Sequence, residues 1–381
     1  MLNLLPAAER ERDWTVDVAR GLAEHESPST DRAALEACAG AVAARCREAG
    51  AAVRREPGRE ADHVLAEWPG RGRPVLLLGH FDTVWPVGQL ARMPVRIAEG
   101  RLFGPGVLDM KAGLAVALTA MKVLDAAVPA ASRPPVRLLA TSDEEVGSRS
   151  SRALIERLAL DSAAVLVFEP GIPGGALKTV RKGVGEFELV VHGVSAHAGA
   201  DPGAGASAVH ELARQIQAIE ALADPSLGRS VNVGVIEGGT RSNVVAERAR
   251  AVVDVRVSRA ADAAVIEAAL AGLRPSRDRI RLEVTGAVNR PPMERTAGVA
   301  RLFHLAREVA AGWGEDLCEG ETGGASDGNF TAALGVPTLD GLGGVGDGPH
   351  ALHEHAIIEF LPRRAALAAG ILAKAAELRD S

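Results

Sequence analysis

The chain has 381 residues and a formal net charge of −6, and 47% of its residues are hydrophobic against 24% charged. This is the composition of a soluble globular protein that is long enough for two domains. The negative charge, and the lack of a basic run interleaved with aromatic residues, argue against a nucleic-acid partner.

The first residues lack the apolar core of a signal peptide, because charged side chains occupy positions 9–13. The most apolar helical pattern, 112–128, is interrupted by Lys122 and Asp125, so no membrane span is predicted. The three cysteines lack a metal-binding spacing, and we expect reduced thiols. These features predict a cytoplasmic protein with no membrane partner.

Residues 1 to about 175 alternate between helical and strand patterns, beginning with a helix predicted over 30–49, which is typical of an α/β domain with a mostly parallel sheet. Three apolar runs predict buried strands, and each run is followed by side chains that can bind a metal. The runs and these side chains are 74–79 with His80 and Asp82, 136–141 with Glu144 and Glu145, and 163–168 with Glu169.

A further candidate ligand, Asp109, lies in the glycine-rich segment 104–113, close to the start of a helical pattern over 114–124. Open α/β sheets bind ligands at the carboxyl ends of their strands. We therefore expect Asp109 and the side chains that follow the strands to share one rim.

The local spacing of these side chains predicts different roles for them. In an extended chain His80 and Asp82 point to the same side, so the carboxylate can hold the imidazole in orientation. Consecutive side chains diverge, and Glu144 and Glu145 are therefore expected to do different work.

The pattern changes after about residue 185 to the order β-α-β-β-α-β, which predicts an inserted ferredoxin-like unit. The chain then returns to the first domain with a helix over 299–311 and the segment around His350. The predicted domains are 1–180 with 291–381, and the insert 181–290. The elements expected in the insert are strands 187–191, 231–236, 249–257 and 280–284 and helices 206–222 and 261–273.

Five motifs in this order resemble the M20 family of zinc peptidases, which includes glutamate carboxypeptidase, N-acyl-amino-acid deacylases and succinyl-diaminopimelate desuccinylase. The resemblance covers nearly the whole chain, and the ordered set is more specific than any one motif. The motifs are GHFDTV at 79–84, GPGVLDMKAG at 104–113, DEEVGS at 143–148, EP at 169–170, and His350 followed by Glu354.

The resemblance implies a three-layer α/β catalytic domain, an inserted lid and dimerisation domain, and two zinc ions bridged by Asp109. Cobalt or manganese would also suit such ligands. Asp82 would orient a ligand and Glu144 would act as general base on a water held between the cations. The remaining ligands would be His80 and Glu169 for one ion, and Glu145 and His350 for the other.

The insert carries two further motifs of the family, GVSAHAG at 193–199 and GGTRSN at 238–243. The resemblance implies that His197 and Asn243 reach the active site of a partner subunit in a homodimer and stabilise an oxyanion. Read alone, His197 is a loop histidine and Asn243 a turn residue.

Substrate recognition is predicted from fewer residues. Arg290 could bind a carboxylate in a bidentate manner, or be a surface arginine. The backbone N–H groups of Gly323 and Gly324 could bind the same group. By resemblance, Glu169 is typical of carboxypeptidase and deacylase members. We therefore predict hydrolysis of an amide that joins an acyl group to an amino acid with a free carboxylate, in an N-acyl amino acid or a short peptide.

Other interpretations remain open at this stage. Residues 324–328 fit the G-x-S-x-G motif of a serine hydrolase with Ser326 as nucleophile, although the acidic, glycine-rich segment before it does not predict a strand. His353 and His355 offer alternative imidazoles to His350. An aminopeptidase-type or dipeptidase member of the family, and a metal-binding module without catalysis, are further alternatives.

Overall fold

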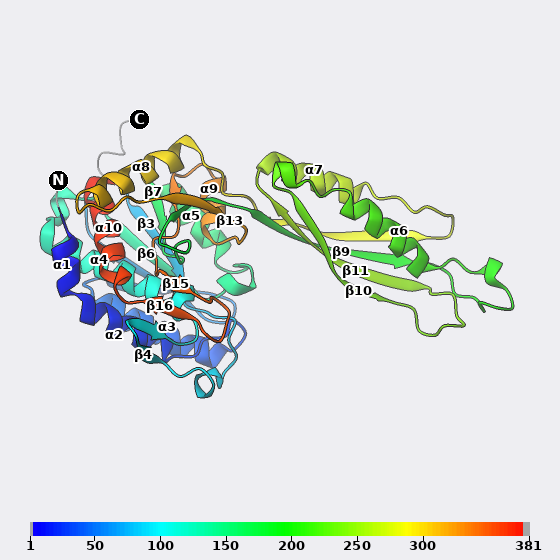
Figure 1. Cartoon of the computed structure of the whole chain (residues 1–381), viewed down its shortest axis with the longest axis horizontal. Helices are drawn as coiled ribbons and strands as arrows, with labels where there is room; N and C mark the ends of the chain where they lie inside the picture. The colour runs from blue at the N-terminus through cyan, green and yellow to red at the C-terminus, as the bar shows by residue number, and fades with distance from the viewer. Residues whose placement is uncertain (1–2, 376–381) are drawn as a thin grey trace. The chain divides into compact units, whose positions relative to one another are not determined.

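A computed structural model describes residues 3–375, and the chain divides into two compact units (Figure 1). The first unit takes the residues up to Val180, Glu294–Thr322 and those from Ser326 onward. The inserted unit takes Arg181–Met293 and Gly323–Ala325. Gly323–Ala325 thus differs from the predicted division, and a reason is that Arg181 Nη1 donates to Gly324 O at 3.1 Å.

The first unit is built on a six-stranded sheet in the order β1-β2-β6-β3-β7-β14. Strands β6, β3, β7 and β14 are parallel, whereas β2 and β1 continue the sheet antiparallel beside β6. The strands are β1 (Ala52–Glu56), β2 (His63–Trp68), β3 (Val75–His80), β6 (Val136–Thr141), β7 (Ala164–Val167) and β14 (Thr338–Leu339).

Helices cover both faces of this sheet, so the first unit is a three-layer α/β structure, as predicted (Figure 1). Alternation along β3 shows why: Leu77 belongs to one buried cluster, whereas Leu76 and Leu78 belong to the other. One face carries α1 (Leu5–Arg10), α2 (Arg12–Ala23), α3 (Arg32–Glu48), α4 (Ala112–Ala127), α8 (Ala297–Ala311) and α10 (Phe360–Lys374), and the other carries α5 (Arg152–Asp161) and α9 (Gly328–Ala333).

Two small sheets lie outside the main one and were not predicted. A four-stranded sheet in the order β15-β16-β5-β4 pairs His355 with Phe103, and so joins the loop of His350 to the segment before Asp109. Its strands are β4 (Arg96–Ala98), β5 (Arg101–Phe103), β15 (Gly346–Asp347) and β16 (His355–Ile357), and the second small sheet pairs β8 (Leu177–Arg181) with β13 (Glu319–Thr322).

The inserted unit has the predicted order β-α-β-β-α-β, in an antiparallel sheet ordered β10-β11-β9-β12. One buried cluster joins this sheet to both helices (Figure 1). The predicted fold class, an α/β domain with an inserted α+β unit, is confirmed. The elements are β9 (Gly183–His192), α6 (Ala208–Glu220), β10 (Ser230–Gly238), β11 (Arg248–Val257), α7 (Ala260–Ala271) and β12 (Arg281–Arg290).

None of the helices within residues 3–375 is both long and apolar enough to cross a membrane.

Candidate metal centre

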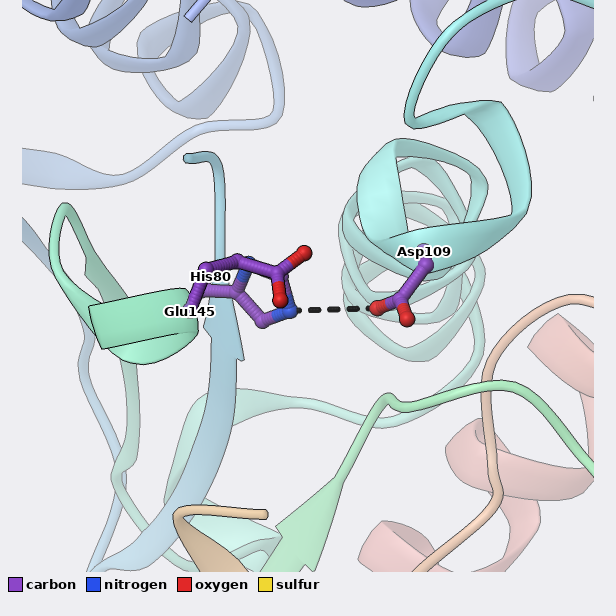
Figure 2. Close-up of side chains that lie close together, drawn as sticks. All are labelled: His80, Asp109 and Glu145. Atoms are coloured by element: carbon purple, nitrogen blue, oxygen red, sulfur yellow. Dashed lines mark hydrogen bonds and ion pairs between the residues drawn. The ribbon is translucent and has the colours of Figure 1, made fainter. Parts of the chain in front are cut away.

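The two oxygens of the Asp109 carboxylate face two different imidazoles. Oδ1 lies 3.2 Å from His80 Nε2, and Oδ2 lies 3.4 Å from His350 Nε2. Figure 2 shows His80, Asp109 and Glu145 converging on one point from β3, from the segment before α4, and from the turn after β6. Asp109 therefore stands between two sets of possible ligands.

Each imidazole has a second carboxylate beside it. Glu169 Oε1 lies 3.5 Å from His80 Nε2, and Glu145 Oε1 lies 3.2 Å from His350 Nε2. Two atoms that each lie about 2.1 Å from one tetrahedral zinc ion are about 3.4 Å apart. The separations of the ligand atoms therefore fit a cation in each set, and the oxygen and nitrogen donors suit zinc, cobalt or manganese.

The site concentrates negative charge, and its pKa values follow from this. Burial alone would lower the pKa of His80, but hydrogen bonds to Asp109, Asp82 and Glu169 outweigh it and raise that pKa well above its usual range. Hydrogen bonds to Asp109 and Glu145 raise the pKa of His350 to about 10. Without a metal, protons on the imidazoles neutralise part of the carboxylate charge.

Metal uptake is therefore expected to release protons. Hydrogen bonds to Asp109 and Glu145 raise the pKa of His350 to about 10, and only a neutral imidazole binds a metal. At pH 8 the proton must leave, so the apparent affinity should fall about tenfold per pH unit for each displaced proton as the pH is lowered. Calorimetry in buffers of different ionisation enthalpy measures the release, and His350→Asn should reduce it. Binding at pH 8 without proton release would contradict this charge balance.

The carboxylate of Asp82 contacts residues of both sets of candidate ligands. Its Oδ1 lies 3.3 Å from His80 Nδ1 and accepts the N–H of Glu144 at 3.2 Å. Its Oδ2 accepts the N–H of Glu145 at 3.1 Å and the hydroxyl of Ser29 at 2.7 Å. The fully buried Asp82 thus orients one imidazole and fixes the backbone of the turn that carries Glu144 and Glu145.

Ser29 is a site residue that the sequence analysis missed. It belongs to a short segment that pins the end of β3: Ser27 Oγ donates to Phe81 O at 2.6 Å, and Thr83 N donates to Ser27 O at 2.8 Å. A Ser-Pro-Ser segment between two helices carries no sequence signal for this role, because the contact depends on the tertiary fold.

Glu354 fixes the backbone that carries Asp109. This buried carboxylate accepts the N–H groups of Gly106 at 2.9 Å, Leu108 at 2.9 Å and Asp109 at 3.1 Å, and the indole N–H of Trp85 at 3.0 Å. Burial raises the pKa of Glu354 although these donors oppose the shift. The sequence showed Glu354 as part of a motif but not what it binds.

The substitution Glu354→Gln should weaken metal binding. Its amide nitrogen cannot accept the N–H groups that the carboxylate oxygens accept, so the backbone at Asp109 would lose part of its support. We expect a roughly 10- to 100-fold loss of metal affinity, as is common for residues that hold a ligand in place, measured by calorimetric titration. Glu359→Gln, on an exposed glutamate paired with Arg363, is the matched control. Equal affinities for both variants would contradict the role of Glu354.

Of the three neighbouring histidines, His350 is the one whose imidazole faces Asp109 and Glu145. The side chain of His353 is exposed and lies 3.8 Å from Asp347, and the ring of His355 lies 5.2 Å from that of Phe103. His350 also has a positive φ of 61°, an uncommon conformation for a residue with a Cβ.

Ser326 does not have the geometry of a nucleophile. It is fully buried, and its Oγ donates to Asp340 Oδ2 at 2.7 Å and accepts the N–H of Gly328 at 3.1 Å. An activated serine needs a hydroxyl that the substrate can reach, and the hydroxyl of Ser326 is fully buried. The hydrogen bonds of Ser326 instead make it part of the loop's internal structure.

The remaining predicted residues lie in the inserted unit. His197 Nδ1 accepts the N–H groups of Gly199 at 3.1 Å and Ala200 at 3.0 Å, and Asn243 O accepts the N–H of Ala198 at 3.0 Å. The two motifs therefore pair within this unit. Arg290 is buried at the end of β12, and Gly323 and Gly324 also belong to this unit.

Comparison with known proteins identifies the family. Residues 76–374 match the Peptidase family M20/M25/M40. The chain belongs to this family. Membership makes it a metal-dependent hydrolase of amide or peptide bonds, as the resemblance in its sequence implied.

The relatives and structural neighbours differ in their substrates. The chain is 29% identical to carboxypeptidase G2 of Pseudomonas sp. (strain RS-16), over 97% of this chain and 91% of that protein. It is 32% identical to succinyl-diaminopimelate desuccinylase 2 of Shewanella loihica, over 58% and 63% respectively. The structure of aminopeptidase PepT from Bacillus cereus superimposes with a TM-score of 0.77 at 22% identity, covering 96% of this chain and 99% of that one. This last likeness shows the fold alone.

Proposed function

We propose that this protein hydrolyses the amide bond between an acyl group and an amino acid with a free carboxylate, using two divalent metal ions. Zinc is the ion we propose, and cobalt or manganese would also suit these ligands. The observation that carries the proposal is the placement of Asp109 between two sets of one imidazole and one glutamate. A carboxylate with both oxygens engaged in this way suits a pair of cations that share it.

The metal ions would lower the pKa of a water and polarise the scissile carbonyl. Glu144 supplies the base: it sits on the same turn as Glu145, its backbone is fixed by Asp82, and its side chain is partly exposed. It takes the proton of the attacking water and passes it to the leaving nitrogen. Asp82 holds the imidazole of His80 and the backbone of this turn in position.

The substrate class is supported by two lines of argument. Carboxypeptidase G2 aligns with almost the whole chain. Two further relatives, the desuccinylase and an acetylornithine deacetylase of Myxococcus xanthus, are named for removing an acyl group. In the inserted unit, Arg290 and the N–H groups of Gly323 and Gly324 could hold the carboxylate of an amino acid. An aminopeptidase or dipeptidase activity is the alternative.

The proposal is tested with a panel of N-acyl amino acids, dipeptides with a carboxyl-terminal glutamate, and dipeptides with a free amino terminus. Zinc-loaded protein should release the amino acid from members of the first two groups, and a chelator should abolish the release because the metal supplies the nucleophile. Cleavage confined to substrates with a free amino terminus would support the aminopeptidase alternative. Turnover that survives complete removal of metal would overturn the mechanism.

The substitution Glu144→Ala should lower kcat by roughly 10²- to 10⁴-fold, the usual contribution of a general base. Metal content should stay the same, because Glu145 and the other candidate ligands remain. Glu156→Ala, on a glutamate of α5 that pairs with Arg152, is the control and should leave kcat unchanged. Unchanged turnover in Glu144→Ala would remove Glu144 from the mechanism.

We further propose that the inserted unit is a lid and dimerisation domain, and that His197 and Asn243 act on the oxyanion in a partner's site. Strand β10 is an edge strand, and its Val235 and Ile236 are 43% and 59% exposed. Exposed edges with apolar side chains are surfaces on which another chain can pair. A second copy of this chain is the occupant we propose.

Light scattering should give twice the 39.5-kDa chain mass for the wild type. Ile236→Lys should shift it toward the monomer, because a charge on the buried edge of an interface would be desolvated. Val265→Lys, at a 51% exposed position on α7 away from β10, is the matched control. A wild type that is active and monomeric at every concentration would rule out the trans role of His197.

A further inference from the structure

A fully buried histidine, His63, lies behind the turn that carries Glu144 and Glu145. It is the first residue of β2, the antiparallel neighbour of β6, and β6 leads into that turn. His63 belongs to none of the motifs singled out in the sequence. Its imidazole has hydrogen-bond contacts with Ser142 and Ser150, which lie on either side of the turn.

The hydrogen bonds around His63 indicate which ring nitrogen carries the proton. Ser142 N donates to Nδ1 at 3.2 Å, while the hydroxyl of Ser142 donates to Ala61 O at 2.8 Å. Nδ1 is therefore an acceptor, and the ring proton lies on Nε2, which is 3.4 Å from Ser150 Oγ. Ser150 Oγ in turn donates to Asp143 Oδ2 at 2.8 Å. Ser142 Oγ also lies 3.1 Å from Nδ1, with its own proton directed at Ala61 O. The neutral tautomer with its proton on Nε2 satisfies all of these contacts.

The electrostatic environment agrees with a neutral ring. Burial lowers the pKa of His63, and this effect outweighs the opposite influence of Asp143, Asp327 and Asp82. A protonated ring would present an N–H to the N–H of Ser142, and this backbone group would lose its acceptor. The neutral state thus matches the direction of the hydrogen bonds.

The network ends on the residues that flank the turn. Asp143 Oδ2 accepts the N–H of Ser150 at 2.7 Å and that of Ser151 at 3.4 Å, and Asp143 O accepts the N–H of Ser148 at 2.8 Å. On the opposite side Asp82 accepts the N–H groups of Glu144 and Glu145, as described above. The turn is therefore held from two sides, by Asp82 next to the ligands and by the network of His63, Ser142, Asp143 and Ser150 behind it.

We propose that His63 is a positioning residue for the reaction, which acts through Ser142, Ser150 and Asp143 to fix the turn bearing Glu144 and Glu145. Its role rests on the proposed function, since Glu144 is the base and Glu145 a metal ligand in that mechanism. A purely structural His63 would affect stability alone. A positioning His63 affects the geometry of the base and of the ligand.

Two substitutions separate these possibilities. In His63→Asn the amide oxygen occupies nearly the place of Nδ1 and can accept the N–H of Ser142, whereas His63→Leu has a similar volume and no acceptor. We expect His63→Leu to lower kcat at saturating metal and to weaken metal affinity, each by roughly 10- to 100-fold, with KM changed less than about threefold. His63→Asn should recover part of both losses, because it restores the acceptor for Ser142 but not the donor to Ser150.

The matched control is His304→Leu, at an exposed position of α8, which should leave all three quantities unchanged. Ser150→Ala, at a half-buried position, provides a second variant if His63→Leu does not fold, and should give a smaller loss in the same two quantities. A His63→Leu variant with wild-type kcat and metal affinity, or equal losses in His63→Leu and His63→Asn, would overturn the proposal.

Nitrogen-15 NMR of the imidazoles gives a readout that needs no substrate. The neutral tautomer with the proton on Nε2 should persist for His63 at pH 7, and a proton on Nδ1 would overturn the proposal. If the wild type cleaves no substrate of the panel, the proposed function fails. The tautomer and the metal affinities of the His63 variants still decide the role of His63 in that case.

Discussion

Mutual repulsion among carboxylates is the constraint on which the first unit depends. The carboxylates of Asp82, Asp109 and Glu169 all face the imidazole of His80, and that of Glu145 faces His350. Glu144 is on the same turn as Glu145. Like charges this close raise the free energy of the folded chain unless positive charge or N–H donors compensate them. The two imidazoles supply part of that compensation, and the candidate cations would supply the rest.

Hydrogen bonds from backbone N–H groups to the buried carboxylates offset much of this repulsion. Asp82 accepts two backbone N–H groups and Glu354 accepts three, so each buried carboxylate stabilises a loop while the loop stabilises its charge. The ring of His63 lies between the N–H of Ser142 and the hydroxyl of Ser150, and that hydroxyl donates to the carboxylate of Asp143.

The sequence predicted the parts of this arrangement that depend on local pattern. His80 and Glu169 follow apolar runs that form β3 and β7, and such runs are visible without a structure. Ser29, Glu354 and His63 could not be assigned roles in this way, because each acts through hydrogen bonds to residues 53 to 269 positions away in the sequence. The small sheet of β4, β5, β15 and β16 escaped prediction because its strands of two or three residues carry no periodic pattern.

The pairing of β16 with β5 has a consequence for how the protein matures. Asp109, His80, Glu145 and Glu169 all leave the ribosome before His350, and His350 lies in the loop between β15 and β16, of which β16 pairs with β5 through His355 and Phe103. During synthesis a cation could therefore meet an incomplete set of ligands but not the bridged pair of sets. The complete set of candidate ligands can therefore assemble only after His350 has been synthesised, which places its assembly late in the folding of the chain.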